Sequence, residues 1–315
     1  MTIGIAGSKG FVGSYLSRRL LARRPGPVRL LVRDTCSRAS VDGAETICGD
    51  LRSLADCDRF AAGLDLIYYL AHTNSPVNSD RDQSTDVMLN QIPLLNLINA
   101  VERLGTRPHI VYFSSGGAVY APKHDNIRYR ETDPCAPLSS YGIQKLAAEH
   151  YLRLAAYKGH LTATVLRVGN AYGTLLPQHR MQGLIGVAIN SVLHDRPVRG
   201  FCDPGNVRDY IHLEDLCDMA DRACIPNREF CVVNVGSGSG HSVTDVFRLI
   251  EDGYGAPVRI QTDMSCGQWL PDWVVLDTTR AQQEFGWSPA IDLRSGILGM
   301  MAEWRLEPET TAEAV

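Results

Sequence analysis

The 315-residue chain has no long apolar segment. None of its uninterrupted hydrophobic runs approaches the roughly 18 to 20 residues needed to cross a bilayer, so we expect no membrane partner. The chain starts directly with a strand-like run and a glycine turn, and no signal peptide is expected. The formal net charge is only −4, without a concentrated basic stripe, which gives no support for nucleic-acid binding.

Cysteine is present without any pattern that would bind a metal. The nine cysteines are scattered, include no Cys-x-x-Cys pair and cannot all form disulfides among themselves. This usage predicts reduced thiols in a cytoplasm, and it predicts neither a disulfide framework nor a zinc site.

Strand-like and helix-like runs alternate along the chain without internal repeats. Such alternation predicts an α/β fold built on a doubly wound parallel sheet. The predicted strands are 2–6, 28–32, 45–48, 66–70, 109–114, 163–167 and 231–235, and the predicted helices lie near 12–23, 52–62, 84–104 and 140–158.

A glycine-rich turn follows the first predicted strand. Gly7, Gly10 and Gly13 stand between an apolar run and an amphipathic helix that starts near Phe11. Glycines at such a place permit a tight turn and let a pyrophosphate approach the helix N-terminus, where free N–H groups stabilise its charge. The motif predicts dinucleotide binding.

Tyr141 and Lys145 lie four residues apart on a predicted helix and therefore share one face. A phenol next to an ammonium and a cationic nicotinamide should have a lowered pKa and serve as an acid/base. The alternative is an ordinary surface pair on a helix. The strand from Tyr112 runs into hydroxyls and glycines, and hydroxyls at the carboxyl end of such a strand face the ligand crevice.

With these features in place, the chain resembles the extended short-chain dehydrogenase/reductase family, and within it the nucleotide-sugar epimerases and dehydratases. Further matching pieces are Gly49–Leu51, Tyr69–His72, Asn90, Leu166–Gly173, Val207–His212 and Asn234–Gly238. The resemblance implies a Rossmann-type domain over 1–173, with a sheet completed by about 208–235. A smaller, interleaved C-terminal substrate lobe would comprise 174–207 and 236–315.

The resemblance also implies roles for individual residues. Tyr141, Lys145 and Ser115 would be catalytic. Together with Tyr141 and Lys145, the implied cofactor-binding residues are Gly7, Gly10, Phe11, Gly13, Arg33, Asp50, Leu51, Leu70, Ala71, His72 and Asn90. Asn170 and Arg208 would bind a nucleotide diphosphate-sugar, since a guanidinium can pair bidentately with phosphate oxygens. An ion pair of Arg208 with Asp209 is the alternative.

Three departures from the family pattern bear on specificity. The relay hydroxyl of many relatives is replaced by Gly116, so that Ser115 or a water molecule must carry the proton. The acidic residue of NAD-preferring relatives is replaced by Val32 and followed by Arg33, which could face a 2′-phosphate or stack on adenine. Asp34 could then supply the carboxylate. NAD and NADP both remain open, with NAD favoured because tightly held NAD is commoner among the epimerases.

The third departure is the stretch Cys266–Asp272, which lacks the arginine that relatives use for the diphosphate. Either Arg208 and other basic residues, such as His179 or Arg180, bind the diphosphate, or the substrate differs from the common uridine diphosphate sugars. Trp269 could stack on a base or simply pack. Gly117 and Ala118 occupy the positions at which sugar 4,6-dehydratases carry an acid and a base, which disfavours dehydration.

These features predict a nucleotide-sugar 4-epimerase with bound NAD. The alternatives are an NADP-linked reductase of a nucleotide-linked 4-keto sugar and a catalytically idle nucleotide-sensing protein. The helices near 84–104 and 140–158 resemble those at a dimer interface in this family, and we expect a homodimer. Leu94, Leu97, Ile98 and Val101 recur at helical spacing there, although this stripe could instead pack on the sheet.

Overall fold

The computed structural model of the protein describes residues 1–23, 26–33, 43–73, 79–175, 183–199, 203–261 and 271–306. The chain divides into two compact units and crosses between them several times. The first contains Met1–Ala121, Glu131–Arg167 and Cys217–Asn234, and the second contains Pro122–Arg130, Val168–Leu216 and Val235–Val315.

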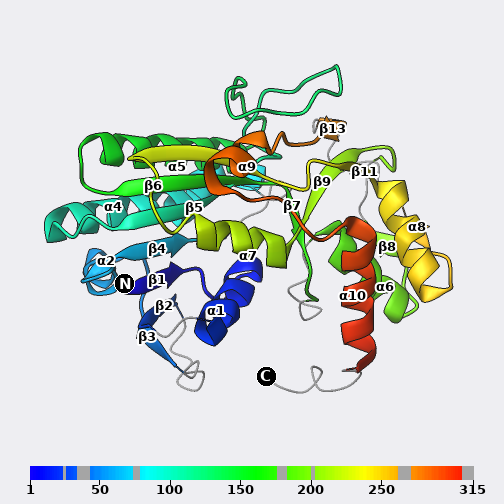
Figure 1. The fold of residues 1–315 in the computed structure, drawn as a ribbon, viewed down its shortest axis with the longest axis horizontal. Coiled ribbons are helices and arrows are strands. Elements are labelled where there is room, and N and C mark those ends of the chain that lie inside the picture. Colours follow the sequence, from blue (N-terminus) through cyan, green and yellow to red (C-terminus); the bar gives the residue numbers. More distant parts are fainter. Residues whose placement is uncertain are drawn as a thin grey trace. The chain divides into compact units, whose positions relative to one another are not determined.

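The first unit is built on a seven-stranded sheet in the order β10-β6-β5-β4-β1-β2-β3 (Figure 1). The strands are β1 (Ile3–Ala6), β2 (Val28–Val32), β3 (Ala44–Cys48), β4 (Leu66–Tyr69), β5 (His109–Ser115), β6 (Thr162–Val168) and β10 (Phe230–Val235). β1 pairs in parallel with both β2 and β4, and β4 pairs in parallel with β5. The predicted doubly wound α/β fold is confirmed, and strand order reverses next to β1, where such folds bind ligands.

One face of this sheet is covered by helices that carry a continuous apolar core. The helical elements of the unit are α1 (Phe11–Arg23), α2 (Leu54–Ala61), η1 (Ser79–Arg81), α3 (Gln83–Asp86), the π-helical turn η2 (Val87–Gln91), α4 (Ile92–Leu104), α5 (Ser140–Tyr157) and part of α7 (Leu213–Arg222). Leu94, Leu97, Ile98 and Val101 are all buried in that core with residues of α2, α5 and the strands. The apolar stripe that we associated with a dimer interface therefore packs inside the unit.

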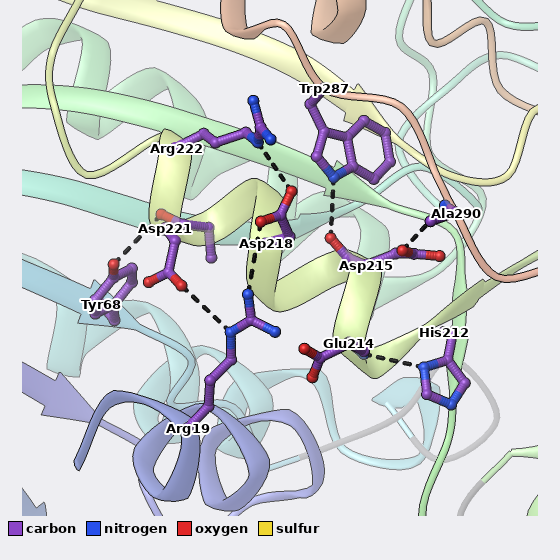
Figure 2. A network of polar contacts seen from close by, with 11 residues as sticks. Arg19, Tyr68, His212, Glu214, Asp215, Asp218, Asp221, Arg222, Trp287 and Ala290 are labelled. Atoms are coloured by element: carbon purple, nitrogen blue, oxygen red, sulfur yellow. Dashed lines mark hydrogen bonds and ion pairs between the residues drawn. The ribbon is translucent and has the colours of Figure 1, made fainter. Parts of the chain in front are cut away.

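The opposite face of the sheet is tied to α7 by polar contacts. Arg19 of α1 reaches Asp221 at 3.2 Å and Asp218 at 3.6 Å, and the Tyr68 hydroxyl donates to the Ala220 carbonyl at 3.3 Å (Figure 2). These contacts anchor α7 to β4 and α1. No described helix is both long and apolar enough to cross a membrane.

The second unit has its own small sheets and core. Its strands are β7 (Asn170–Tyr172), β8 (Val198–Arg199), β9 (Val207–His212), β11 (Gly240–Ser242), β12 (Ile260–Gln261) and β13 (Trp273–Val274), and its helices are α6 (Leu184–Leu193), α8 (Val243–Tyr254), α9 (Thr279–Phe285) and α10 (Leu293–Leu306). Trp287 donates to the Asp215 carbonyl at 3.1 Å, a contact drawn in Figure 2. Within the expected range of about 208–235, β10 joins the large sheet, whereas β9 pairs with β7, β11 and β13.

Candidate active site

The turn between β1 and α1 has no room for side chains at its glycines. Gly7 has φ of +93°, and a Cβ there would lie 2.7 Å from the Ala71 amide nitrogen. A Cβ on Gly13 would collide with the Gly7 carbonyl oxygen. The Gly10 amide donates to that same carbonyl at 3.0 Å, and Phe11 starts α1. The bare backbone and the helix N-terminus form a cradle that fits a dinucleotide pyrophosphate.

Charged residues follow at the ends of β2 and β3. Arg33 is exposed, and Asp50 forms an ion pair with Arg52 at 2.7 Å. The pKa of Asp50 is lowered, chiefly by the Arg52 hydrogen bond, with Arg33 contributing through its charge. Leu51 is buried, and its carbonyl accepts a hydrogen bond from Asn96 at 2.9 Å. The Arg33 charge therefore acts on Asp50, while Asp34 lies outside the described residues.

Three consecutive residues of β5 are bound by three residues of α5. Lys145 Nζ donates to the Phe113 carbonyl at 2.8 Å, and the Ser114 hydroxyl donates to Glu149 Oε1 at 2.5 Å. The Ser115 side chain lies beside the Tyr141 phenol and lowers its pKa. Tyr141, Lys145 and Glu149 are spaced by four residues, so one helix face is aligned with the end of the strand.

The first turn of α5 is fixed closely against its surroundings. The Ser139 side chain caps the helix by accepting from the Gly142 amide at 3.1 Å. The Ser140 hydroxyl donates to the buried Asp86 carboxylate at 2.6 Å. A Cβ on Gly142 would collide with the Ala118 carbonyl, so glycine lets the helix approach the segment that follows β5. Tyr141 sits in this anchored turn.

Burial dominates the protonation of both candidate catalytic groups. It raises the pKa of Tyr141 to about 12, against which the Ser115 hydrogen bond lowers it. Burial also lowers the pKa of Lys145 to about 7, against which Glu149 raises it. The lowering expected from the ammonium and a cationic nicotinamide together stays a prediction, and burial acts in the opposite direction on the phenol pKa. The Lys145 nitrogen lies 5.6 Å from the Tyr141 ring centroid and donates to a carbonyl, so it offsets little of the cost of burying a phenolate.

His72 and Asn90 reach this site from the segments that follow β4. The His72 ring packs edge-on against the Tyr141 ring, with 4.8 Å between centroids, and burial keeps the pKa of His72 well below its usual value. The side-chain oxygen of Asn90 accepts a hydrogen bond from the Thr73 backbone amide at 2.8 Å, and its side-chain nitrogen donates to the Asp86 carboxylate at 2.7 Å. Both polar groups of the Asn90 side chain therefore hydrogen-bond other residues of the protein, as in a residue that supports the structure of the site. Leu70 and Ala71 line the Gly7 turn.

The polar groups behind the site were not predicted from the sequence motifs. Glu149, Arg167 and Ser114 are all buried, and Arg167 Nη2 contacts Glu149 Oε2 at 2.7 Å. A signal was available, because Glu149 lies four residues after Lys145 on the same predicted helix face. Arg167 belongs to the matching piece Leu166–Gly173, but the sequence did not indicate which residue it contacts.

The two candidate substrate residues lie in the second unit. Asn170 is exposed on β7, opposite Tyr210 of β9. Arg208 is half-buried, and its guanidinium donates to the carbonyls of Val207 at 2.8 Å and Asp272 at 3.3 Å.

The Asp209 carboxylate is buried on the same strand. It accepts hydrogen bonds from the backbone amides of Ser237, Gly238 and Leu276. These contacts tie three segments of the second unit together, and neighbouring residues of a strand point to opposite faces. The alternative of an Arg208–Asp209 ion pair is not what the contacts of Asp209 show. His179, Arg180 and Trp269 lie outside the described residues.

The described site can carry out proton exchange with an alcohol. A buried phenol in contact with a hydroxyl gives a path for a proton, and a nearby lysine supplies positive charge when it is protonated. A nucleotide cradle lies in the same unit. Among the described residues no group of three or more His, Cys, Asp or Glu is placed to hold a metal.

Known proteins are similar to this chain in sequence and fold. The model of the NAD dependent epimerase/dehydratase family matches residues 3–236. The chain is 29% identical over 309 residues to the UDP-glucose 4-epimerase of Mycolicibacterium smegmatis, covering 93% of this chain and 95% of that protein. It is 27% identical over 323 residues to the dTDP-6-deoxy-L-talose 4-dehydrogenase (NAD(P)(+)) of Kitasatospora kifunensis, covering 94% and 93%.

A solved structure is also similar to this chain over nearly its whole length. The UDP-glucose 4-epimerase of Thermus thermophilus, crystallised as a complex with NAD, has a TM-score of 0.86 and 28% identity, covering 97% of this chain and 99% of that one. The family match spans well over half of the chain, in agreement with the resemblance drawn from its motifs. The chain therefore belongs to the NAD dependent epimerase/dehydratase family.

Proposed function

We propose that the protein is a nucleotide-sugar epimerase that inverts C4 of its substrate through a 4-keto sugar. The observation that carries this proposal is the contact of Tyr141 with Ser115 on a helix face that also bears Lys145. When bound, NAD would supply reversible hydride transfer at C4 of the sugar. The relatives named UDP-glucose 4-epimerase support a uridine diphosphate sugar as substrate.

In this proposal each side chain has a separate task. Tyr141 takes the proton from the C4 hydroxyl and gives it back, and Ser115 relays that proton at the position next to Gly116. Lys145 supplies positive charge beside the phenol and hydrogen-bonds the nicotinamide ribose. Asn170 and Arg208 bind the sugar and its diphosphate. The raised pKa of Tyr141 fits a group that is protonated before cofactor and substrate arrive.

Dehydration is disfavoured by the residues that follow β5. Eliminating water from a sugar needs an acid and a base in addition to the tyrosine. Gly117 and Ala118 have no ionisable side chain, and Gly116 has none either. The site therefore retains the groups for alcohol/ketone interconversion alone.

The β1–α1 cradle fits NAD, and its glycines would contact the pyrophosphate. A second candidate function, reduction of a nucleotide-linked 4-keto sugar with NADPH, draws on Arg33. This arginine is exposed after β2, and its charge lowers the pKa of Asp50. It could therefore bind a 2′-phosphate. The similarity to a dehydrogenase whose name includes NAD(P)(+) supports the same candidate.

We also propose a homodimer, formed through different residues from those we expected. Exposed apolar side chains lie on η2 and α4 (Met88 and Ile92) and on α5 (Ile143, Leu154 and Tyr157). Met88 is 61% exposed and Tyr157 is 89% exposed, which is unusual for large apolar groups. α4 and α5 pack against each other, so these side chains can form one surface for a second copy.

The cofactor content of the purified protein separates the two enzymatic candidates. An epimerase must keep its cofactor between turnovers, so about one NAD per chain should survive desalting. Nucleotide released by acid and identified by chromatography gives the answer. Loss of the cofactor on desalting, together with NADPH-dependent reduction of a 4-keto sugar, would replace the epimerase with the reductase.

A further inference from the structure

A buried ion pair lies directly behind the candidate catalytic residues. The Glu149 side chain is 4% exposed and that of Arg167 is 6% exposed. Their contacts are Arg167 Nη2 to Oε2 at 2.7 Å and Nε to Oε1 and Oε2 at 3.1 and 3.2 Å. Nothing in the proposed proton transfer uses either residue, although burying two charges is costly.

The pair connects α5 to two strands of the sheet. Arg167 lies on β6, and Ser114 on neighbouring β5 gives its hydroxyl proton to Glu149 at 2.5 Å. The Arg167 guanidinium also lies 4.8 Å from the Tyr120 ring centroid, and Tyr120 donates to Asn234 of β10 at 2.5 Å. Glu149 is therefore fixed from several sides.

The Glu149 carboxylate can affect both Ser115 and Lys145. Ser114 immediately precedes Ser115, so the hydrogen bond to Glu149 fixes the strand where Ser115 meets Tyr141. Lys145 lies one helical turn before Glu149. The groups facing Lys145 are the rings of Tyr112 and Tyr141, at 5.1 and 5.6 Å, and His72, whose own pKa is lowered by the lysine charge as well as by burial. None of these supplies the negative charge that Glu149 supplies.

We propose that Glu149 is a positioning residue of the active site: held by Arg167, it sets Ser115 against Tyr141 through Ser114 and provides the charge that favours the ammonium form of Lys145. This inference rests on the proposed function for its effect on turnover. Stability alone does not explain the pair, because replacing a buried ion pair by apolar groups of similar volume is often neutral or stabilising.

The effect of the Glu149 charge on Lys145 can be measured directly by NMR, because the chain has only four lysines, Lys9, Lys123, Lys145 and Lys158. In as-purified protein labelled with 13C-lysine, the NMR titration midpoint of Lys145 should fall by at least about one pH unit in Glu149→Gln. The basic limb of kcat/KM against pH should move down with it. Glu149→Asp, which keeps the charge, should bring both values back toward the wild type.

A double variant separates this role from a structural one. Glu149→Gln leaves the Arg167 charge buried without a partner and should therefore lower stability, whereas Glu149→Gln with Arg167→Met removes both charges. The proposal expects the low Lys145 midpoint to persist in the double variant. A return of the midpoint and of the pH profile to wild-type values would overturn it, because it would show that only the stranded arginine mattered.

Ser114→Ala tests the positional half. It should lower kcat by at least about tenfold, at an unchanged Lys145 midpoint. Wild-type kcat in this variant would overturn that half. Glu229→Gln is the matched control for Glu149→Gln, because Glu229 forms an exposed ion pair with Arg107 in the same unit. If the wild type turns over no nucleotide sugar, the proposed function fails while the lysine titration still decides the charge.

Discussion

The Ser115 side chain lies beside the phenol of Tyr141 and lowers its pKa. The contact forms although Gly116 stands at the place where relatives carry their relay hydroxyl. It connects the last residue of β5 to the anchored first turn of α5. Ser115 is therefore the residue that we propose as the proton relay in place of the usual one.

Ser115→Ala should reduce turnover by at least about tenfold, a loss of ~1.4 kcal/mol in transition-state stabilisation. Gly116→Ser should help little while Ser115 is present. Measuring kcat of both variants with the same sugar separates the two possible paths. A silent Ser115→Ala with a faster Gly116→Ser would instead assign the relay to water or to the substrate.

Tyr141→Phe should lower kcat by roughly 10²- to 10⁴-fold, the range for loss of a general acid/base. Phenylalanine keeps the buried ring and its packing against His72, so folding and NAD affinity should change little. Steady-state kinetics, thermal unfolding and NAD titration test the three parts. Undiminished turnover would remove Tyr141 from the reaction.

Lys145 should make stability depend on pH. Burial lowers its pKa to about 7 in the folded protein from 10.5, so between these values the unfolded chain binds more protons. The free energy of unfolding of the wild type, relative to Lys145→Met, should therefore rise from about pH 7 to about pH 9. Urea unfolding of both proteins across this range measures it. A difference that is flat or falls with pH would show that Lys145 keeps its proton.

The exposed side chains of α4 and α5 should hold a dimer together. Leu154→Glu places a charge on that surface and should yield monomers at micromolar concentration, as measured by light scattering. Leu54→Glu is the matched control, because Leu54 is similarly exposed on α2, and it should leave the dimer intact. A monomeric wild type, or equal behaviour of the two variants, would contradict the proposed interface.

Much of the fold could be predicted from local patterns. The seven strands of the large sheet were recognisable because each is a short apolar run next to a turn, and the glycine spacing marks the β1–α1 cradle. The pairing of β9 with β7, β11 and β13 could not be predicted, because the sequence of a strand reveals its burial pattern but not its partners.

The site was harder to predict, since it depends on contacts between distant segments. Helical spacing correctly placed Tyr141 and Lys145 on one face, yet the phenol pKa depends on how deeply the fold buries it. The apolar periodicity in α4 could not distinguish a core face from a dimer face. Glu149 and Arg167, 18 residues apart, become partners only once α5 packs against β6.

The most direct test of the proposed function is to incubate the purified protein with UDP-glucose and no added cofactor, and to follow the anomeric region by NMR. A 4-epimerase should produce a new anomeric signal, that of the C4 epimer, and approach the same mixture from UDP-galactose, while Tyr141→Phe should not do so at a comparable rate. If no uridine, thymidine or guanosine diphosphate sugar gives a new anomeric signal while the protein carries stoichiometric NAD, the epimerase assignment is contradicted.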